Sequence, residues 1–425
     1  MKDKKNLMVQ WDGETVGILA PHRKGQVKFS YTPEWIENHN LPVSLSMPCA
    51  DVSFDSRKST AFFENFLPEA DIYKELCREA RIDGVDTYQF LRVFGQECAG
   101  ALVIFPEGEP PESPLPDAYR DITDDLEAIL EASDGIPSSS LMAETQTRLS
   151  IGGAQNKLPV VFENERFLVP ADKSYAPTTA ILKPATASFP NLHRNEGFCM
   201  ALAREVGLQT PDTEILQIGN HHAYLVTRYD RKPAENGVAR IHQEDFCQAM
   251  GLGRLYKYEK EGGPGFSACG KTLLHPLISE NAVVRESFIR CVLFNYIIGN
   301  CDANGKNFSL LYRDKKNVEL APFYDLSSTR VYPEWTKKCA MAIGKTFHID
   351  RIAQQSWKQF AVDMNIRPNW LYELMEEFHG AVASAVEPLA TAHEQQYGAS
   401  PIYESLVDVV KEGLIRLGRI VESKG

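Results

Sequence analysis

An apolar stretch that ends at Gly299 is followed at once by a dense group of polar side chains, and this junction constrains the fold more than any other part of the chain. Asp302 and Asn307 stand five positions apart, and Asp325 ends the next strand-like apolar segment, 318–325. Phosphoryl transfer requires a carboxylate that orients the attacking hydroxyl and hard oxygen ligands that hold Mg²⁺. The spacing therefore predicts a phosphoryl-transfer site just beyond a buried element.

The same residues allow a simpler interpretation. Asp, Asn and Gly are common turn formers, so 302–307 is equally compatible with a polar turn after a helix, with Asp325 capping the next element. The Asp-to-Asn spacing is that of a protein-kinase catalytic loop. Residues 300–301 read Asn-Cys in place of His-Arg, however, and 324–326 read Tyr-Asp-Leu in place of Asp-Phe-Gly. An ordinary eukaryotic-type kinase is therefore disfavoured.

Composition limits the class of protein. A chain of 425 residues is long enough for two or three domains, and 43% hydrophobic with 24% charged residues is typical of a soluble globular protein. The formal charge of −12 argues against a stand-alone nucleic-acid binder. Any contact with DNA would need a local basic patch or a basic partner.

The cysteines and the apolar runs indicate the compartment. Nine cysteines are scattered singly, with no C-x-x-C pair, which favours reduced thiols in a cytoplasmic protein over disulfides or zinc ligands. The N-terminal apolar run is too short for a signal peptide. The longest apolar run, near 292–298, is far shorter than a membrane span, so no membrane partner is expected.

The chain is expected to begin with a small β-rich unit. Leu7–Trp11 and 16–19 flank Asp12 and Gly13, a hairpin signal, and Val27–Tyr31 alternates as a half-buried strand does.

Helices are predicted at 62–67 and 72–91, followed by a strand at 99–105. Residues 106–116 are rich in proline and charge, so we interpret them as a linker and a subdomain boundary. A helix is expected near 124–132, and the chain beyond 229 is predicted to be mostly helical.

A glycine-containing segment at 148–161 is a candidate phosphate-covering loop, because backbone N–H groups without side chains nearby can approach an anion. It is neither a Walker A motif nor G-x-G-x-x-G, and a plain hairpin is about as compatible. The candidate residues are Gly152, Gly153, Ala154, Gln155, Asn156 and Lys157.

Lys183 ends an apolar strand, where it could pair with nucleotide phosphates or be a solvated strand-end charge. Asn195 and Glu196 are predicted to open a helix that runs to Val206 and stops at Gly207. Glu196 could orient Lys183, although the helix dipole alone explains an acid at that position.

The strand predicted at 223–229 leaves a β-rich half of the chain and enters an α-rich half, so it is a natural hinge. Adenine would lie against its backbone at Thr227, Arg228 and Tyr229.

The order of these motifs is more informative than any one of them, and with it the sequence resembles the HipA family of bacterial serine/threonine kinase toxins. The resemblance runs nearly the whole chain. The matching stretches are 11–17, 31–35, 44–48, 63–68, the loop at Ser150, 243–245, 262–265 and 299–308.

The resemblance implies an α+β, two-lobed protein-kinase-like fold with an extra N-terminal β-rich subdomain and an all-helical C-terminal lobe. The expected parts are an N-terminal subdomain at 1–110, an N-lobe with the glycine loop and the strand lysine at 111–229, and a helical C-lobe with the catalytic loop and the metal site at 230–425.

The resemblance also implies the roles of individual residues, with ATP and Mg²⁺ as cofactors. Asp302 is the expected catalytic base, Asn307 and Asp325 are the expected Mg²⁺ ligands, and Ser150 is the expected autophosphorylation site. The other expected ATP-site residues are Gly152 to Lys157, Lys183, Thr227 to Tyr229, Asn304, Gly305, Lys306 and Tyr324. Asn304 departs from the best-known member, which has a histidine there.

Family members are typically held by a small helix-turn-helix antitoxin that binds operator DNA, and known targets include aminoacyl-tRNA synthetases. The resemblance therefore implies such partners here, with DNA contacted mainly through the antitoxin. Two other functions remain open. One is a small-molecule phosphotransferase, since those folds share the Asp, Asn and Asp layout, and the other is a catalytically silent corepressor in a DNA complex.

Overall fold

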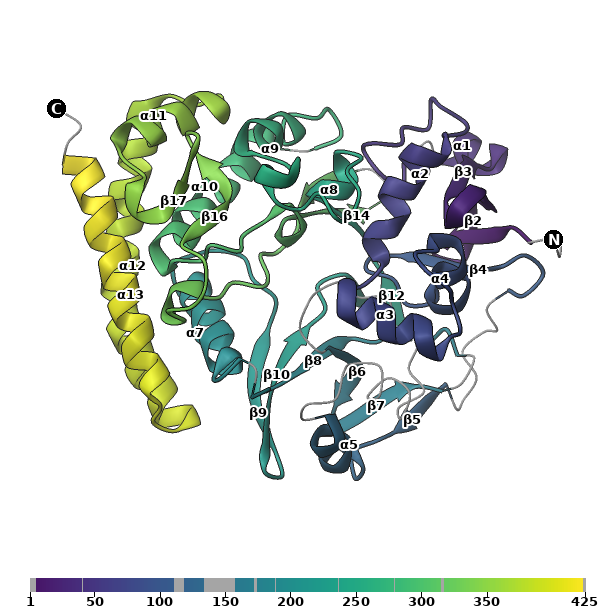
Figure 1. Ribbon diagram of the computed structural model, residues 1–425, viewed down its shortest axis with the longest axis horizontal. Coiled ribbons are helices and arrows are strands. Elements are labelled where there is room, and N and C mark those ends of the chain that lie inside the picture. The colour runs from purple at the N-terminus through teal and green to yellow at the C-terminus, as the bar shows by residue number, and fades with distance from the viewer. Residues whose placement is uncertain are drawn as a thin grey trace. The chain divides into compact units, whose positions relative to one another are not determined.

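The computed structural model describes residues 5–39, 41–110, 118–133, 157–171, 174–187, 189–235, 237–278, 280–314 and 317–422. The chain divides into two compact units, whose elements are labelled in Figure 1. Unit 1 comprises Met1–Ser188, Leu216–Arg254 and Leu311–Lys316, and unit 2 comprises Phe189–Ile215, Leu255–Leu310 and Asn317–Gly425.

The boundaries predicted at 110/111 and 229/230 both lie within unit 1, and the division into three parts stays a prediction. Long-range ion pairs join residues across both positions. Arg228 and Arg231, which lie on either side of the second boundary, both pair with Glu97.

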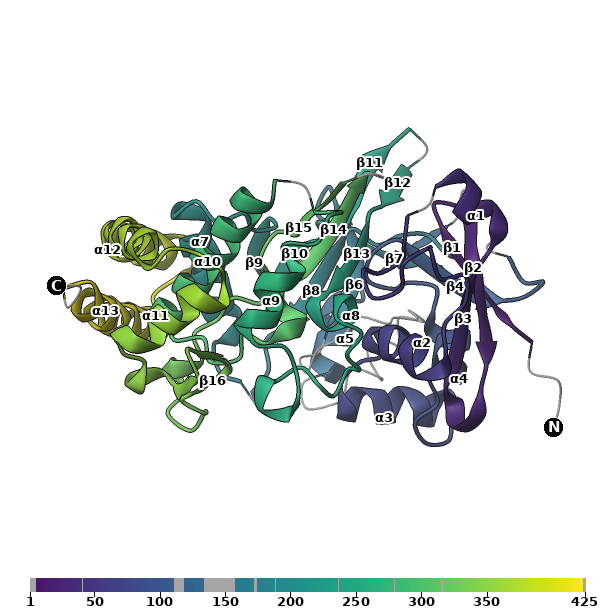
Figure 2. The same cartoon turned by 90° about the horizontal axis from the view of Figure 1, so that it is seen from above.

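Unit 1 begins with an antiparallel sheet of strand order β3-β2-β1-β4 (Figure 2). The strands are β1 (Leu7–Trp11), β2 (Glu14–Pro21), β3 (Val27–Tyr31) and β4 (Leu102–Pro106). Asp12 and Gly13 both have positive φ, of 52° and 78°, as a type I′ hairpin turn requires. The predicted hairpin and third strand are therefore confirmed.

Four helices accompany this sheet: α1 (Pro33–Asn38), α2 (Ser56–Phe63), α3 (Ala70–Glu79) and α4 (Thr87–Phe94). The single helix predicted at 72–91 is wrong, because Gly84 has φ +67° and Asp86 caps a new helix by accepting a hydrogen bond of 2.8 Å from the Gln89 N–H. The helix predicted from Phe62 begins earlier, at Ser56, where Asp55 caps it.

A second sheet has the strand order β5-β7-β6-β8-β10-β9. Its strands are β5 (Tyr119–Asp121), β6 (Leu158–Glu163), β7 (Arg166–Pro170), β8 (Ala180–Pro184), β9 (Thr213–Ile218) and β10 (His221–Thr227). Helix α5 (Leu126–Ser133) buries Leu126 and Leu130 in an apolar core with Leu158, Leu182 and Leu225 of this sheet.

Two of the stretches noted in the sequence, 44–48 and 243–245, contact each other in unit 1. The Leu45 N–H and the Tyr312 hydroxyl donate to the Glu244 carboxyl at 2.9 and 2.6 Å, and the Ser46 hydroxyl donates to the Gln248 carbonyl at 2.8 Å. The local elements are β11 (Arg231–Ala234), β12 (Gly237–Arg240), β13 (His242–Asp245) and α8 (Phe246–Ala249).

Unit 2 contains α7 (Leu192–Glu205), α9 (Phe266–Thr272), α10 (Asn281–Ile298), α11 (Gln354–Asp363), α12 (Pro368–Tyr397) and α13 (Pro401–Glu422). Its strands are β15 (Asn317–Leu320), β16 (Lys338–Ile343) and β17 (Thr346–His348), and β14 (Ser309–Asp314) passes from unit 2 into unit 1. The chain after 230 is thus not helical throughout, since strands β11 to β17 precede the helical C-terminal region that starts at α11.

Helices α12 and α13 lie side by side in both views, and α7 packs against them (Figures 1 and 2). The start predicted for α7 is wrong by three residues: the helix begins at Leu192, so Asn195 and Glu196 lie inside it and are buried. Its predicted stop is confirmed, because Gly207 has φ +85°. No helix in the described part of the chain combines the length and the apolar content needed to cross a membrane.

Candidate active site

The candidate site is built on the C-terminal end of α10, whose residues from Cys291 to Ile298 are all buried. Gly299 ends the helix in the left-handed conformation, with φ 69°, and its N–H bonds to the Asn295 carbonyl. A Cβ at Gly299 would lie 2.5 Å from Cγ of Arg330. Glycine is therefore required here by both backbone conformation and space, and it turns the chain directly into the polar loop.

Neutral amide side chains hold this loop in shape. The Asn300 side chain donates to the Asn295 carbonyl oxygen Oδ1 at 2.8 Å and accepts from the Asp302 N–H at 3.0 Å. The Asn304 side chain donates to the Asp302 backbone carbonyl at 3.0 Å. Asp302 is therefore fixed through its backbone on both sides, while its carboxylate remains exposed.

Asn304 and Asn307 close the loop with a reciprocal cap around the short 3-10 turn Gly305–Asn307. The Asn304 Oδ1 accepts from the Lys306 N–H at 2.9 Å, and the Asn307 Oδ1 accepts from the Asn304 N–H at 3.1 Å. The run from Asp302 to Asn307 is thus a capped turn and also a rigid frame for an exposed carboxylate.

Tyr324 and Asp325 are tied to this frame. The Tyr324 hydroxyl donates to the Lys306 carbonyl at 2.7 Å and lies 2.7 Å from the Ser309 hydroxyl. Asp325 has φ 54°, a left-handed conformation that aspartate tolerates better than most residues. The strand expected to end at Asp325 is wrong, because β15 ends at Leu320 and residues 321–328 have no regular structure.

The two residues expected to hold Mg²⁺, Asn307 and Asp325, carry oxygen donors of a suitable kind. The Asn307 amide oxygen has two lone pairs, of which the Asn304 N–H uses one, and Asp325 supplies a carboxylate. These are hard oxygen ligands of the kind that hold Mg²⁺ together with substrate phosphates. No group of three or more His, Cys, Asp or Glu side chains within the described ranges is arranged to hold a metal ion, so an all-protein cage is not formed there.

The structure contradicts the interpretation of Lys183 as a solvated charge, because its side chain is only 4% exposed. It lies on β8 opposite Tyr224 of β10, with its amine 5.8 Å from the centre of that ring. A buried ammonium group must be paired, which is compatible with a role at a phosphate site. Lys157 lies just before β6 and is partly buried, whereas Ser150, Gly152, Gly153, Ala154, Gln155 and Asn156 lie outside the described residues.

Glu196 is likewise buried, at 4% exposure, on α7 in unit 2. The neighbouring Asn195 side chain donates to the Ser328 carbonyl and accepts from the Ser328 N–H, both at 2.8 Å. The pairing of Glu196 with Lys183 stays a prediction.

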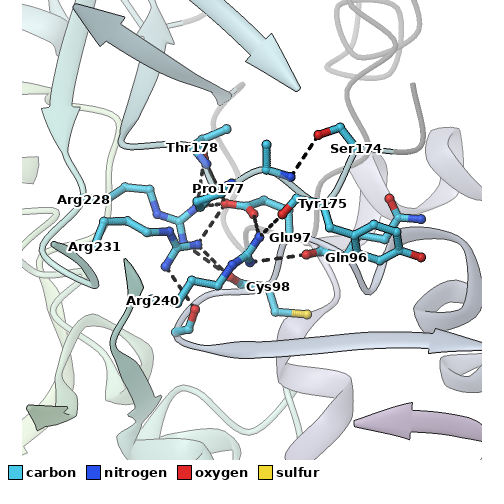
Figure 3. A network of polar contacts seen from close by, with 12 residues as sticks. Gln96, Glu97, Cys98, Ser174, Tyr175, Pro177, Thr178, Arg228, Arg231 and Arg240 are labelled. Atoms are coloured by element: carbon cyan, nitrogen blue, oxygen red, sulfur yellow. Dashed lines mark hydrogen bonds and ion pairs between the residues drawn. The ribbon is translucent and has the colours of Figure 1, made fainter. Parts of the chain in front are cut away.

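The hinge residues differ sharply from one another. Thr227 is exposed at the end of β10, and the Tyr229 hydroxyl donates to the Gln243 side chain. All five guanidinium donors of Arg228 are used inside unit 1, on Glu97, Thr178, Cys98 and Asp230. Figure 3 shows the first three of these partners. Its N–H bonds to the Thr179 carbonyl at 2.8 Å. The Arg228 side chain therefore stabilises the end of β10, and a contact with adenine would have to come from its carbonyl.

Arg228 belongs to a buried ion network that sequence reasoning missed (Figure 3). Glu97 pairs with Arg228, Arg231 and Arg240 at 2.7, 2.9 and 2.7 Å, and Asp230 pairs with Arg228 and Arg231 at 2.7 and 2.9 Å. Burial alone would raise the pKa of Glu97, but the three guanidinium groups outweigh it and hold the pKa at about 2. Only the adjacent charges at 228, 230 and 231 hinted at this network in the sequence.

Sequence reasoning also missed Tyr258, whose hydroxyl donates to the Asp302 carboxylate at 2.7 Å. The two residues are 44 positions apart, so no local pattern links them. The only signal was the neighbouring glycine-rich stretch 262–265.

Unit 2 carries an exposed carboxylate on a loop held by amide side chains, and unit 1 carries a buried lysine on a central strand; each feature is typical of a kinase-like protein. Comparison with known families agrees with this class. The profile described as "HipA N-terminal domain" matches residues 7–105, and the profile described as "HipA-like C-terminal domain" matches residues 149–386. The chain belongs to the HipA family.

Individual relatives are consistent with this assignment. A protein of Sinorhizobium fredii, named as a candidate kinase, is 37% identical over 365 residues, covering 85% of this chain and 86% of the relative. The "Serine/threonine-protein kinase toxin HipA" of Shewanella oneidensis is 27% identical over 379 residues, covering 84% of this chain and 82% of the relative.

The fold is that of a solved HipA. The Shewanella oneidensis HipA in a complex with HipB and operator DNA matches with a TM-score of 0.79 and 23% identity, covering 99% of this chain and all of the other. The expected α+β fold is thereby confirmed.

Proposed function

We propose that this protein is an ATP- and Mg²⁺-dependent serine/threonine protein kinase that acts as the toxin of a toxin–antitoxin pair. The observation that carries the proposal is the exposed Asp302 carboxylate on a loop held by Asn300, Asn304 and Asn307. A carboxylate that must accept a proton from a substrate hydroxyl needs this combination of fixed position and access. The kinase name of the Shewanella relative supports the same reaction class.

Each residue has a distinct part in the proposed reaction. Mg²⁺-ATP, when bound, supplies the phosphoryl group. Asp302 orients the acceptor hydroxyl and takes its proton, and Asn307 and Asp325 would hold the metal ion. Lys183, oriented by Glu196, would contact the phosphates, while the backbone at Thr227 to Tyr229 would face adenine. Gly152 to Lys157 would cover the phosphates, with Asn304, Gly305, Lys306 and Tyr324 lining the site.

The Asp302→Asn variant tests this proposal. We expect it to keep its fold and its ATP affinity but to transfer phosphate roughly 10²- to 10⁴-fold more slowly, because a positioned base contributes about that much. Asp408→Asn, at an exposed site on α13, is the matched control and should behave like the wild type. A rate of transfer by Asp302→Asn close to that of the wild type would refute the assignment of the base.

The proposed kinase is inactivated by autophosphorylation at Ser150, next to the glycine loop. A phosphoserine adds roughly −1.5 to −2 charges, which would repel the ATP phosphates. Mass spectrometry after incubation with Mg²⁺-ATP, together with ATP titration of the modified chain, tests this. An active preparation without phosphate on Ser150, or a Ser150-phosphorylated chain that binds ATP normally, would contradict it.

The proposed partners are a small helix-turn-helix antitoxin, operator DNA reached mainly through it, and a protein substrate such as an aminoacyl-tRNA synthetase. The solved Shewanella complex of HipA, HipB and operator DNA supports the first two. With a formal charge of −12, the isolated chain should bind operator DNA weakly. Mobility shifts with and without the neighbour-encoded protein test this, and phosphoproteomics of wild-type against Asp302→Asn cells would identify the substrate.

A further inference from the structure

The segment Lys257 and Tyr258 contacts the catalytic loop at two points. The Tyr258 hydroxyl donates to Oδ1 of Asp302 at 2.7 Å, and the Lys257 carbonyl accepts from the Gly305 N–H at 3.1 Å. Both contacts lie within unit 2. The side chain of the proposed base and the backbone three residues later are thus held by one short segment.

This segment has a closed, rigid backbone. The Tyr258 carbonyl accepts from the Glu261 and Gly263 N–H groups, both at 2.9 Å. A Cβ on Gly263 would lie 2.5 Å from the Tyr256 carbonyl oxygen and 2.7 Å from that of Tyr258, so only glycine allows the turn to close this tightly. The stretch 262–265 therefore shapes the turn that presents Tyr258.

Strand β16 anchors both the segment and the loop. The Glu259 carboxylate accepts from the Ala342 N–H at 2.6 Å, and the Cys301 carbonyl accepts from the Ala340 N–H at 2.8 Å. Residues on either side of the contact between Tyr258 and Asp302 are therefore bonded to the same strand. A hydroxyl held in this way is a built-in part of the site.

A carboxylate has two oxygens with about four acceptor positions, and the Tyr258 hydroxyl uses one of them. Asp302 is exposed, so its carboxylate is open to solvent. A hydrogen bond to one oxygen fixes the rotation of the carboxylate and stabilises its charged form, which is the form that accepts a proton.

We propose that Tyr258 is a positioning residue for the base: its hydroxyl fixes one oxygen of Asp302 so that the other is directed to the acceptor hydroxyl. This inference rests on the proposed kinase function. A competing arrangement, in which Tyr258 occupies the place of the acceptor and blocks it, would need a segment free to move away. The bonds to β16 and within the turn oppose such a movement.

The test compares the full-length wild type with Tyr258→Phe, Tyr332→Phe and Asp302→Asn. Tyr332 is the matched control, because its hydroxyl lies in the same unit and donates to the Pro190 carbonyl at 3.1 Å. The first-turnover rate of phosphate incorporation into the chain is measured against ATP concentration and pH. The titration of the Asp302 carboxyl is followed separately by ¹³C NMR of aspartate-labelled protein, with Asp302→Asn identifying the signal.

We expect Tyr258→Phe to lower the maximal rate about tenfold, a fraction of what loss of the base removes, and to leave the ATP concentration for half-maximal rate unchanged. The acidic limb of the pH profile and the pKa of Asp302 should both move to higher pH, because a donor to the carboxylate has been lost. Tyr332→Phe should match the wild type in all respects.

Different outcomes separate the two proposals. An inactive wild type would overturn the kinase assignment. The NMR titration would still show whether the Tyr258 hydroxyl bonds to the Asp302 carboxylate. An active wild type with an unchanged rate and an unchanged Asp302 pKa in Tyr258→Phe would overturn the positioning role alone. A faster Tyr258→Phe, or phosphate found on Tyr258 itself, would show that the hydroxyl occupies the acceptor place and would also overturn it.

Discussion

Two charged sites, one in each unit of the molecule, are built in opposite ways. In unit 1, three arginines and two carboxylates are buried together and neutralise one another through direct ion pairs. Figure 3 shows the three arginines around Glu97. In unit 2, Asp302 is exposed, and neutral groups contact it: the amides of Asn300 and Asn304 bond to its backbone, and the Tyr258 hydroxyl bonds to its carboxylate.

This difference shows how an ionised group can be made either structural or reactive. A buried charge is tolerable only when opposite charges surround it, and it is then unavailable to a ligand. A charge that must accept a proton has to be held without being neutralised, and neutral hydrogen-bond donors do that. The sequence predicts that Arg228 lies beside ATP, but its side chain is a structural charge that is paired with Glu97 and Asp230.

The largest effect is expected when one charge is removed from the buried ion network of unit 1. Glu97→Gln would leave three guanidinium groups against the single carboxylate of Asp230, in a buried site. We expect the free energy of unfolding to fall by roughly 3–5 kcal/mol, as when one partner of a buried ion pair is lost. Urea denaturation of the full chain measures it.

The matched control for Glu97→Gln is Asp121→Asn, which removes an acid from the exposed ion pair with Arg166 in the same unit. Exposed pairs contribute little, so the urea midpoint should stay close to that of the wild type. Equal losses in the two variants would show that burial of the network is not what makes it matter.

Glu244 extends the comparison. Its carboxyl accepts hydrogen bonds from neutral donors, as that of Asp302 does, but Glu244 is buried. Burial raises its pKa to about 7, against the hydrogen bonds from Ser44, Tyr312 and the Leu45 N–H. The folded state therefore binds a proton between pH 4.5 and 7 that the unfolded state releases. The stability due to this group is full below pH 4.5 and is lost as the pH rises to 7.

We expect Glu244→Gln to remove this dependence on pH. Between pH 4.5 and pH 8, the unfolding free energy of the wild type should fall by roughly 3 kcal/mol relative to that of the variant. The nearby His242 acts in the opposite direction. Burial lowers its pKa to about 4, so its contribution to the unfolding free energy rises as the pH increases from 4 to 6.5. Because both proteins contain His242, subtracting their urea curves at each pH isolates Glu244. If the difference in unfolding free energy between the two proteins stayed constant from pH 4.5 to pH 8, Glu244 would not be protonated in the folded state.

A smaller effect tests whether the frame around Asp302 must be neutral. Asn300→Asp keeps the acceptor for the Asp302 N–H but loses the donor to Asn295 while ionised. We expect the unfolding free energy at pH 8 to fall by roughly 1–3 kcal/mol, the penalty for a buried unsatisfied group. The loss should shrink at pH 5, where a protonated carboxyl can donate again.

Asn369→Asp, exposed in the first turn of α12, is the control for Asn300→Asp. An acid near a helix N-terminus is favourable, so no loss is expected at either pH. If Asn300→Asp were as stable as this control at pH 8, neutral donors would not be essential to the loop.

Local patterns predicted the parts of the site that are close in sequence. The glycine that ends α10, the polar turn after it and the hairpin at Asp12 and Gly13 follow from turn and cap chemistry within a few residues. Tyr258 beside Asp302 and Glu97 beside Arg228 could not be predicted in this way, because 44 and 131 residues separate the partners. Such pairs are created by tertiary packing alone.

Burial was the other limit on prediction. Lys183 follows an apolar run whether its amine is solvated or enclosed, and the tertiary packing around β8, which pairs with both β6 and β10, decides that it is enclosed. The start of α7 was misplaced for a related reason. Asn191 precedes the helix in a left-handed conformation, with φ 58°, and its side chain makes no capping hydrogen bond, so the start at Leu192 departs from the usual N-cap geometry.

The interleaving of the two units has a consequence for biosynthesis. Glu244 receives a hydrogen bond from Tyr312, and Tyr312 lies in the last of the three stretches that form unit 1. A ribosome synthesises all of the second stretch of unit 2, Leu255–Leu310, which includes Asp302, before it reaches Tyr312. A nascent chain that stops before Tyr312 therefore carries the proposed base while one of its buried carboxyls still lacks its partner. Completion of the first unit is thus delayed until after the loop that carries Asp302 has been made.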